Sequence, residues 1–536
     1  MSPAAPAPGG AGRSAGAGAG RSTGTGRSAG SGVGRSTGTG RSAGSGVGRS
    51  TGTGRSTGTG VGGGRRGGTV LIENAYIAPV TGEEIPRGYI RIDGDRITAL
   101  GPGPAPAMSA TQGVEWIDGS GCLATPGLVN THHHLYQWAS QGLAQDAALF
   151  DWLVALYPVW AAMDAEIVHG AAGAGLGFLA LSGCTTSSDH HYVFPKGRGD
   201  LLAAEIEAAR EVGVRFHPAR GSMDRGRSAG GLPPDSVVER LDDILTATAE
   251  AIDAHHDPSF SSKLRIAVAP CSPFSVSADL MTEAAALARD KGVRLHTHLA
   301  ETLDEEEHCL AQLGLRPVGY LERLGWLGPD VWVAHAVHLG DADIDVFAQT
   351  GTGSAHCPSS NGRLGAGVAR VAEMLRRGAV VGLGVDGSAS AELTSMSGEM
   401  RQALLLQRAR YGPAALTTRQ ALEIATLGGA RNLGREAEIG SLEPGKLADV
   451  ALWRTDTPFA SAVADPVAAL VLGARQPPLA RLLVGGETIV ADDELRTVAQ
   501  DELGRAGGAA HRRLMRLAGE QGLATAGEVG PPPGQM

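Results

Sequence analysis

Between Pro126 and about residue 425, short apolar runs alternate with longer amphipathic stretches. Short apolar runs bounded by turns are typical of buried strands, and apolar positions that recur about every 3.6 residues are typical of helices. The pattern predicts helices over Leu201–Val212, Ser277–Lys291 and Val368–Arg377. It predicts eight strands: Leu128–His132, Cys184–Ser188, Val214–Pro218, Leu264–Ala269, Val293–His298, Val331–His335, Gly353–His356 and Val380–Asp386. Eight such units predict an α/β fold, a (β/α)₈ TIM barrel, whose functional residues lie where the strands end.

The segments on both sides of this region also have strand character. Val70–Ile77, Gly88–Ile92 and Arg96–Leu100 precede it, and Ile439–Leu452 and Leu482–Val490 follow it. We therefore expect a flanking β-sandwich formed by both ends of the ordered chain. The predicted boundaries are a tail over 1–68, the first part of the sandwich over 69–125, the barrel over 126–425, the second part of the sandwich over 426–495, and a C-terminal helix with a flexible end over 496–536.

The first 68 residues are a low-complexity tail. A unit that starts Arg-Ser-Thr-Gly-Thr-Gly begins at Arg21 and again at Arg35, with a near copy at Arg49. Chains this rich in Gly and Ser bury too little apolar surface to offset their conformational entropy, so we expect disorder. The tail is compatible with a basic tether for nucleic acid or an acidic surface, with a dispensable extension, or with sequence upstream of a later start.

Charge differs sharply between the tail and the remainder of the chain. The tail holds nine arginines and no lysine or acid, whereas the whole chain has a net charge of -10, which leaves -19 for the other residues. An acidic body lacks the basic footprint that phosphate binding requires. Nucleic acid is therefore not expected as the main partner.

Composition also bounds the cellular location. The five cysteines are scattered and form no CxxC pair, which favours a reducing compartment over a disulfide scaffold. No apolar run approaches the length of a bilayer span, and the N-terminus lacks the apolar core of a secretory signal. We expect a cytoplasmic protein without a membrane partner.

Candidate chemistry begins in the stretch Pro126–Gln137, which contains three consecutive histidines. Side chains alternate along a strand, so His132 and His134 point the same way and can reach one metal ion. Taken alone, a run of histidines is equally compatible with solvated loop residues. Further polar residues, however, follow the ends of later predicted strands.

Those later strand ends supply the remaining groups of a metal site. His298 ends the fifth strand, and Asp386 ends the eighth. With His132 and His134, they offer three neutral nitrogens and one carboxylate, which leaves room for water, as in a catalytic rather than a structural site. Each of these residues alone is also compatible with a buried histidine or a capping aspartate. We expect one divalent ion, zinc, with iron as the alternative.

Several motifs, in order, closely resemble the amidohydrolase superfamily: PGLVNTHHH, HTHLAET, AHAVHL, HCPSSN, GLGVDGSAS and the closing GSLEPGKLADV. The resemblance covers roughly residues 69–495 and implies the same barrel and flanking sandwich. Binuclear members carry a carboxylated lysine at the end of the fourth strand, where this chain has Val268-Ala269-Pro270-Cys271, so one metal is expected. The resemblance also implies catalytic roles. Asp386 would accept a proton from the attacking water, His335 would orient that water, and Glu301 would protonate a ring nitrogen of the substrate.

Within the superfamily, the aromatic-rich stretch 149–160 and the stretch 182–192 resemble the 8-oxoguanine deaminase branch. That resemblance implies deamination of 8-oxoguanine to urate and ammonia. Close relatives commonly carry Leu-Thr-Arg after the Tyr-Gln pair, where this chain has Trp138-Ala139-Ser140-Gln141, so a basic side chain is missing. Gln137, His190 and Asn361 are the expected substrate contacts, although each is equally compatible with a hydrogen bond within the scaffold. The helical spacing of Trp152, Tyr157 and Trp160 favours core packing over contact with a ligand.

Alternatives remain within the same branch and outside it. The same residues suit a triazine or hydroxyatrazine hydrolase and a guanine or pterin deaminase. A non-catalytic barrel scaffold is the alternative from another class, and retention of all four predicted ligands and of Glu301 argues against it. The expected partner is a small purine-like heterocycle, and because enzymes of this type often pair, a homo-oligomer, a dimer, is expected.

Overall fold

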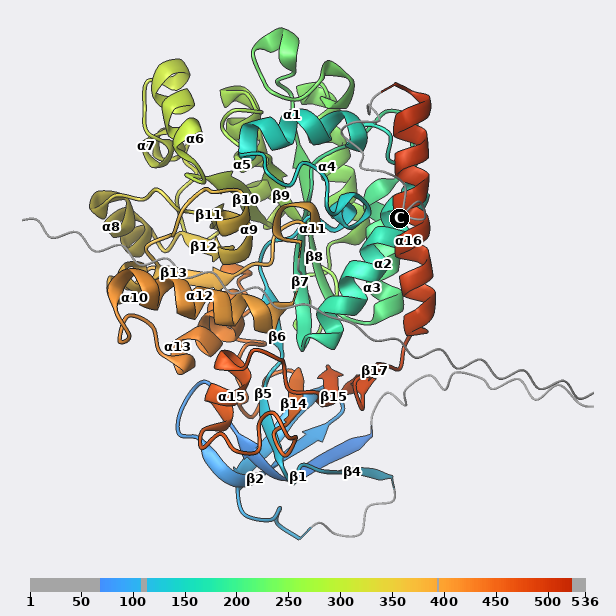
Figure 1. The fold of residues 1–536 in the computed structure, drawn as a ribbon, viewed down its shortest axis with the longest axis vertical. Coiled ribbons are helices and arrows are strands. Elements are labelled where there is room, and N and C mark those ends of the chain that lie inside the picture. Colours follow the sequence, from blue (N-terminus) through green and yellow to red (C-terminus); the bar gives the residue numbers. More distant parts are fainter. Residues whose placement is uncertain (1–67, 108–112, 393–394, 523–536) are drawn as a thin grey trace, which may run out of the picture. The chain divides into compact units, whose positions relative to one another are not determined.

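Eight parallel strands close into a barrel in the computed structural model, which describes residues 68–107, 113–392 and 395–522 (Figure 1). The strands are β6 (Leu128–Asn130), β7 (Cys184–His191), β8 (Arg215–Ser222), β9 (Ala267–Pro270), β10 (Arg294–Leu299), β11 (Val331–His335), β12 (Gly353–His356) and β13 (Val380–Leu383). They follow one another around the barrel in chain order, and β13 pairs with β6 to close it. All eight predicted strands are present, so the predicted barrel is confirmed.

Closure of the barrel depends on Asn130. Its side chain donates to Ser187 Oγ on β7 (3.0 Å) and accepts from the backbone of Val385, which follows β13 (3.0 Å). β6 and β13 both end before their predicted last residues, because the chain bends there. His132 and Asp386 therefore lie in the turns beyond the strand ends.

Helices connect the strands and surround them (Figure 1). They are α1 (Leu149–Trp160), α2 (Ala165–Leu181), α3 (Leu201–Val212), α4 (Leu241–His255), α5 (Ala278–Lys291), α6 (Leu303–His308), α7 (Pro317–Arg323), α8 (Asp341–Thr350), α9 (Pro358–Arg363), α10 (Val371–Arg376), α11 (Ser388–Ala391), α12 (Met396–Tyr411), α13 (Thr418–Glu423), α14 (Gly429–Asn432), α15 (Pro466–Leu472) and α16 (Gln500–Glu520). Single turns of 3₁₀ or π type are η1 (Leu135–Ser140), η2 (Arg227–Ala229), η3 (Asp235–Val237), η4 (Cys309–Leu313) and η5 (Ile424–Gly428).

Local signals set the bounds of the predicted helices. α3 matches its prediction, because the Asp200 side chain accepts from Ala203 N at its start and Gly213 takes the left-handed conformation at its end (φ 90°). α5 begins one residue late, because Ser277 is its N-cap. α10 is shorter than predicted at both ends.

The remaining strands form one nine-stranded sheet in the order β17-β16-β15-β14-β5-β1-β2-β3, with β4 paired to β1. The N-terminal strands are β1 (Thr69–Ile77), β2 (Ile85–Asp93), β3 (Arg96–Pro102), β4 (Val114–Asp118) and β5 (Cys122–Pro126). The C-terminal strands are β14 (Val450–Arg454), β15 (Leu479–Val484), β16 (Glu487–Ala491) and β17 (Glu494–Leu495). Antiparallel pairing of β5 with β14 joins the two sets, so a separate sheet built by both chain ends is confirmed.

Glycines alter two of the predicted C-terminal strands. Gly440 and Gly445 have positive φ values (88° and 95°), so the chain before Val450 turns rather than extends. Gly485 and Gly486 also have positive φ values (57° and 76°) and split the predicted strand Leu482–Val490 into the hairpin of β15 and β16.

The structure bears on two of the three general expectations, those on membrane spans and cysteines, but not on the tail. The tail over residues 1–67 lies outside the described residues, so its disorder stays a prediction. Across the described ranges, none of the helices combines the length and the apolar character needed to cross a bilayer. All five cysteines are buried and free of disulfides.

Candidate active site

His132 has its proton position fixed by two neighbours deep in the barrel. His296 Nδ1 donates to the Trp332 carbonyl (2.9 Å), so His296 Nε2 accepts from His132 Nδ1 (2.8 Å). His132 Nε2 then carries a lone pair. It is buried, has no hydrogen-bond partner among the described residues, and lies 3.4 Å from Asp386 Oδ1.

His134 and His298 have the same tautomer for the same kind of reason. His134 Nδ1 donates to the His190 carbonyl (2.7 Å), and His298 Nδ1 donates to the Cys271 carbonyl (2.6 Å). The Nε2 atoms of His134 and His298 lie 3.1 Å apart, and His134 Nε2 lies 3.4 Å from Asp386 Oδ1. Backbone carbonyls that orient imidazoles in this way are typical of metal-ligating histidines.

Asp386 brings the carboxylate to these nitrogens through an unusual backbone conformation. Its φ is 62°, and its N–H donates to the His132 carbonyl (3.1 Å), which ties the turn after β13 to the turn after β6. Burial alone would raise the pKa of the Asp386 carboxyl, but the neighbouring imidazoles, His132 first and then His335 and His134, hold that pKa well below its ordinary value. A non-glycine residue held at positive φ is often found at functional sites.

These groups fit a divalent cation. Atoms of His132, His134 and Asp386 lie within 4.8 Å of one another, and His298 adjoins His134. Lone pairs of neutral imidazoles and an ionised carboxylate are the donors that zinc or iron prefers. One ring nitrogen of His190 also lies within 4.8 Å of those of His132 and His298.

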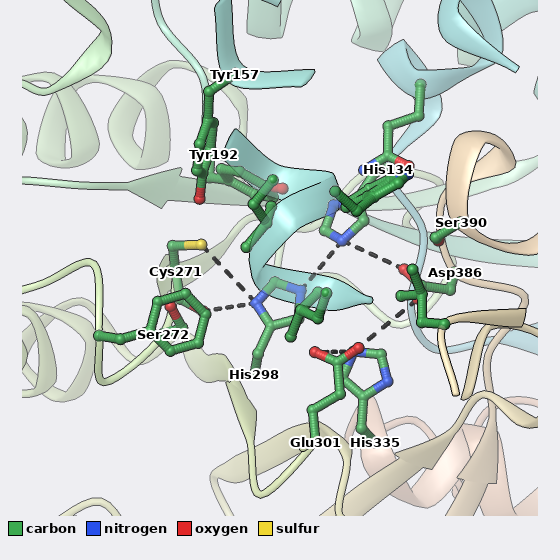
Figure 2. Close-up of a pocket in the computed structure, with 16 residues that line it drawn as sticks. His134, Tyr157, Tyr192, Cys271, Ser272, His298, Glu301, His335, Asp386 and Ser390 are labelled. Carbon is green, nitrogen blue, oxygen red and sulfur yellow. Dashed lines mark hydrogen bonds and ion pairs between the residues drawn. The ribbon is translucent and has the colours of Figure 1, made fainter. Parts of the chain in front are cut away.

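Glu301 and His335 lie on the other side of Asp386 (Figure 2). His335 Nε2 is 3.5 Å from Glu301 Oε2 and 4.0 Å from Asp386 Oδ2. His335 Nδ1 donates to Asn361 Oδ1 (3.0 Å), so its Nε2 lone pair faces the two acids. Burial first, then the charges of Asp386 and Glu305, raise the pKa of Glu301 well above its ordinary value, which favours the protonated carboxyl that a proton donor needs.

Glu305 holds the bend that carries Glu301. Its two carboxylate oxygens accept from the backbone N–H groups of Ala300 and Glu301, each at 2.8 Å, and Ala300 has a φ of 51°. Burial raises the pKa of Glu305 to about 7. Sequence reasoning did not select Glu305 or His296. His296 and His298 are two residues apart on one strand and so point the same way, and this spacing could have identified His296.

A cavity opens onto the cluster. Its polar lining includes the predicted site residues His134, His298, Glu301, His335 and Asp386. Other residues complete the lining: Gln137, Leu149, Trp152, Leu153, Tyr157, Tyr192, Cys271, Ser272, Phe274, Leu364 and Ser390. About half of the lining is thus aromatic or aliphatic and half is polar, and the polar groups gather at the cluster, which is typical of a site for a small ligand.

The predicted substrate contacts occupy different places. Gln137 lines the cavity, whereas Asn361 lies behind His335 and His190 lies behind His134 and His298. Trp152, Tyr157 and Trp160 are buried as the helical spacing predicts. Trp152 and Tyr157 also line the cavity, which the periodicity of one helix cannot show.

Comparison with known proteins gives consistent matches. The amidohydrolase family model matches residues 123–489. The chain is 45% identical to an 8-oxoguanine deaminase of Pseudomonas aeruginosa over 407 residues, which are 76% of this chain and 90% of that protein. It is 37% identical to an isoxanthopterin deaminase of an unknown prokaryotic organism over 81% of this chain and 93% of that protein.

Among solved structures, the chain resembles an atrazine chlorohydrolase of Arthrobacter aurescens TC1 in complex with zinc. The TM-score is 0.78 at 32% sequence identity, covering 82% of this chain and all of that chain (100%).

Proposed function

This chain belongs to the amidohydrolase family, and from that premise we propose that it catalyses the hydrolytic deamination of 8-oxoguanine to urate and ammonia. The family match and the deaminase relatives make it a hydrolase that acts on carbon–nitrogen bonds. One observation supports the chemistry above all: the ring nitrogens of His132, His134 and His298 form one cluster with the carboxylate of Asp386, and Asp386 and Glu301 both line the cavity beside that cluster.

We propose that His132, His134, His298 and Asp386 hold one divalent ion. A divalent ion bound there lowers the pKa of water towards roughly 7 and so supplies a nucleophile at neutral pH. The neutral tautomers of the three histidines, fixed by His296 and by two backbone carbonyls, suit this role without any loss of protons on binding.

The remaining residues move protons. Asp386 accepts a proton from the attacking water, and His335 orients that water through its Nε2 lone pair, which Asn361 directs towards the acids. Glu301 donates to the ring nitrogen beside the amino-bearing carbon while the new carbon–oxygen bond forms. The bond to the amino nitrogen then breaks, and ammonia leaves with the proton that Asp386 took from the water. The remaining hydroxyl proton returns to Glu301 as the new carbonyl forms. His190 and Asn361 act in this proposal by positioning the histidines, and Gln137 contacts the substrate.

The substrate is tested by turnover with a panel. The protein reconstituted with zinc or iron is assayed for ammonia release from 8-oxoguanine, guanine and isoxanthopterin, and for ethylamine release from hydroxyatrazine. We expect the highest kcat/KM with 8-oxoguanine. Isoxanthopterin is the second candidate, because the isoxanthopterin deaminase is 37% identical over most of both chains. Turnover of a pterin or a triazine without turnover of 8-oxoguanine would overturn the proposal.

Replacement of Glu301 by Gln tests the mechanism. The amide cannot donate a proton as a carboxylic acid does, so kcat is expected to fall about 10²–10⁴-fold. Metal content, measured by mass spectrometry, is expected to stay stoichiometric, because Glu301 is not a proposed ligand. Glu307→Gln, an exposed acid of the adjoining α6, is the matched control. Equal activity of the two variants would contradict the role of Glu301.

A further inference from the structure

Two tryptophans of α1 have different hydrogen-bonding states. Trp160 is buried and its Nε1 donates to Ser140 Oγ (3.0 Å). Trp152 is only 2% exposed, yet its Nε1 has no hydrogen-bond partner in the part of the chain that the structure describes. The same holds for the hydroxyl of Tyr157 and for Gln137 Oε1, both fully enclosed.

These unpaired atoms belong to side chains that line a single cavity, the one above the proposed metal site. Leaving a buried donor unpaired is costly, and buried polar groups in folded proteins nearly always have a partner. Three such side chains around one cavity therefore indicate that a ligand supplies the partners. An indole N–H can only donate, a phenol can donate or accept, and an amide oxygen can only accept.

The charge of the cavity restricts that ligand further. Among the described residues that line it, the acids are Glu301 and Asp386, and none is an arginine or a lysine. Phosphate binding requires cationic side chains or clustered backbone N–H groups. The cavity thus suits a neutral, flat free base that offers both a carbonyl and an N–H, and not a nucleotide.

Gln137 and Trp152 line the same cavity from different elements. The Gln137 amide lies at the metal side, because a Cβ added to Gly387, next to Asp386, would come within 1.8 Å of Gln137 Oε1. Trp152 belongs to α1, which lies at the end of the barrel away from the nine-stranded sheet (Figure 1), and its ring packs against Trp160 with the ring centroids 5.3 Å apart. Because Gln137 adjoins the proposed metal site and Trp152 comes from α1, the proposed binding mode assigns Trp152 to the end of the ligand that is remote from the reacting carbon.

We propose that Trp152 Nε1 donates to a carbonyl oxygen on the remote ring of the substrate, and that this bond makes the enzyme select an oxo-heterocycle over its parent. The inference rests on the proposed function, in which the remote carbonyl is the 8-oxo group that distinguishes 8-oxoguanine from guanine. Tyr157, whose hydroxyl can also donate, flanks the same end.

The test compares Trp152→Phe with Trp160→Phe on the two substrates. Phenylalanine retains an aromatic ring but lacks the N–H. For Trp152→Phe, the ratio of kcat/KM for 8-oxoguanine over guanine is expected to fall about 10–100-fold. For Trp160→Phe, whose N–H has a partner inside the protein, the ratio is expected to stay unchanged even if the variant unfolds at a lower temperature. An equal loss on both substrates, or no loss, in Trp152→Phe overturns the inference.

Failure of the proposed function gives a different result. In that case wild-type protein does not turn over 8-oxoguanine, and the same ratio is measured for isoxanthopterin over pterin, which differ by a carbonyl on the ring remote from the amino group. Where a compound is bound but not turned over, the rise in Tm that it causes measures its binding, and the comparison is made between the Tm rises of the two members of a pair. If Trp152→Phe lowers the preference for the oxo-heterocycle over its parent in either pair, the result supports a hydrogen bond from Trp152 to the remote carbonyl. Unchanged Tm shifts with both pairs overturn it.

Discussion

At the scale of single residues, the candidate site depends on where protons lie on imidazole rings. The chain from the Trp332 carbonyl through His296 to His132 leaves one lone pair directed at Asp386. His296 itself is not one of the proposed metal ligands. Its contribution is to fix a tautomer, and that contribution can be measured separately from catalysis.

Replacement of His296 by Ala is expected to weaken metal binding. Without its acceptor, His132 Nδ1 loses the partner that holds its proton, so the metal-binding tautomer is no longer enforced. Loss of such a supporting partner typically lowers metal affinity about 10–100-fold. Competition with a chromophoric chelator measures the affinity, and His255→Ala, on the outer helix α4, is the control. Identical zinc affinities for the two variants would contradict the assigned role.

At the scale of elements, a buried glutamate–histidine pair joins β7 to α3 behind the site. Glu205 on α3 lies 2.7 Å from His191 Nδ1, and His191 Nε2 donates to the Val193 carbonyl (2.9 Å). Asp189 accepts from the backbone N–H of Leu135, the residue after His134 (2.6 Å). Burial raises the pKa of Glu205 to about 8 and lowers that of His191 to about 4, so the neutral acid donates to the neutral imidazole.

This protonated glutamate predicts a pH dependence of stability. The folded protein retains the Glu205 proton up to about pH 8, whereas the unfolded chain releases it near the ordinary value of 4.5. The contribution of Glu205 is therefore complete below pH 4.5 and is lost as the pH rises towards 8, by at most about 1.4 kcal/mol per pH unit.

Glu205→Gln can donate to His191 without titrating. Urea unfolding of both proteins, with a chelator present throughout, is expected to show that the stability of the wild type relative to the variant declines between pH 5 and pH 8. Parallel stability profiles would mean that Glu205 is ionised in the folded protein.

The elements also show which features of the fold and the site can be predicted from the sequence alone. The eight barrel strands were predictable because buried parallel strands are continuous apolar runs, and His132, His134, His298 and Asp386 follow from their positions at strand ends. The hydrogen bonds that orient these residues from other strands were not predictable. His132 and His296 are 164 residues apart, and periodicity carries no information on which side chains meet across a barrel. The same limit applies to Trp152, whose helical spacing places it on a buried face but does not show the cavity there.

At the scale of the whole molecule, one buried ion pair fastens the barrel to the nine-stranded sheet. Arg215 on β8 donates to both carboxylate oxygens of Asp449, at 2.8 and 3.0 Å, and both side chains are almost fully buried. Asp449 also accepts from Gly485 N (2.7 Å). The aspartate of the GKLADV motif thus has a structural role far from the cavity.

Replacement of Asp449 by Asn is expected to lower the free energy of unfolding by about 3–5 kcal/mol, because it leaves the Arg215 guanidinium buried without its counterion. Asp492→Asn is the matched control, since Asp492 pairs with Arg454 at the surface (2.9 Å) and exposed pairs contribute at most about 1 kcal/mol. Chemical denaturation measures both. Equal losses of stability would show that the buried pair contributes no more to the free energy of unfolding than the exposed pair does.

The pairing of β5 with β14 has a consequence for biosynthesis. A ribosome releases β5 more than 300 residues before the strand that covers its edge, since β5 ends at Pro126 and β14 begins at Val450. Until then the nascent chain presents an open strand edge, which is a template for association with other chains. Premature termination anywhere within the barrel therefore yields a polypeptide prone to aggregate, and a chaperone that shields this edge during elongation would raise the yield of active protein.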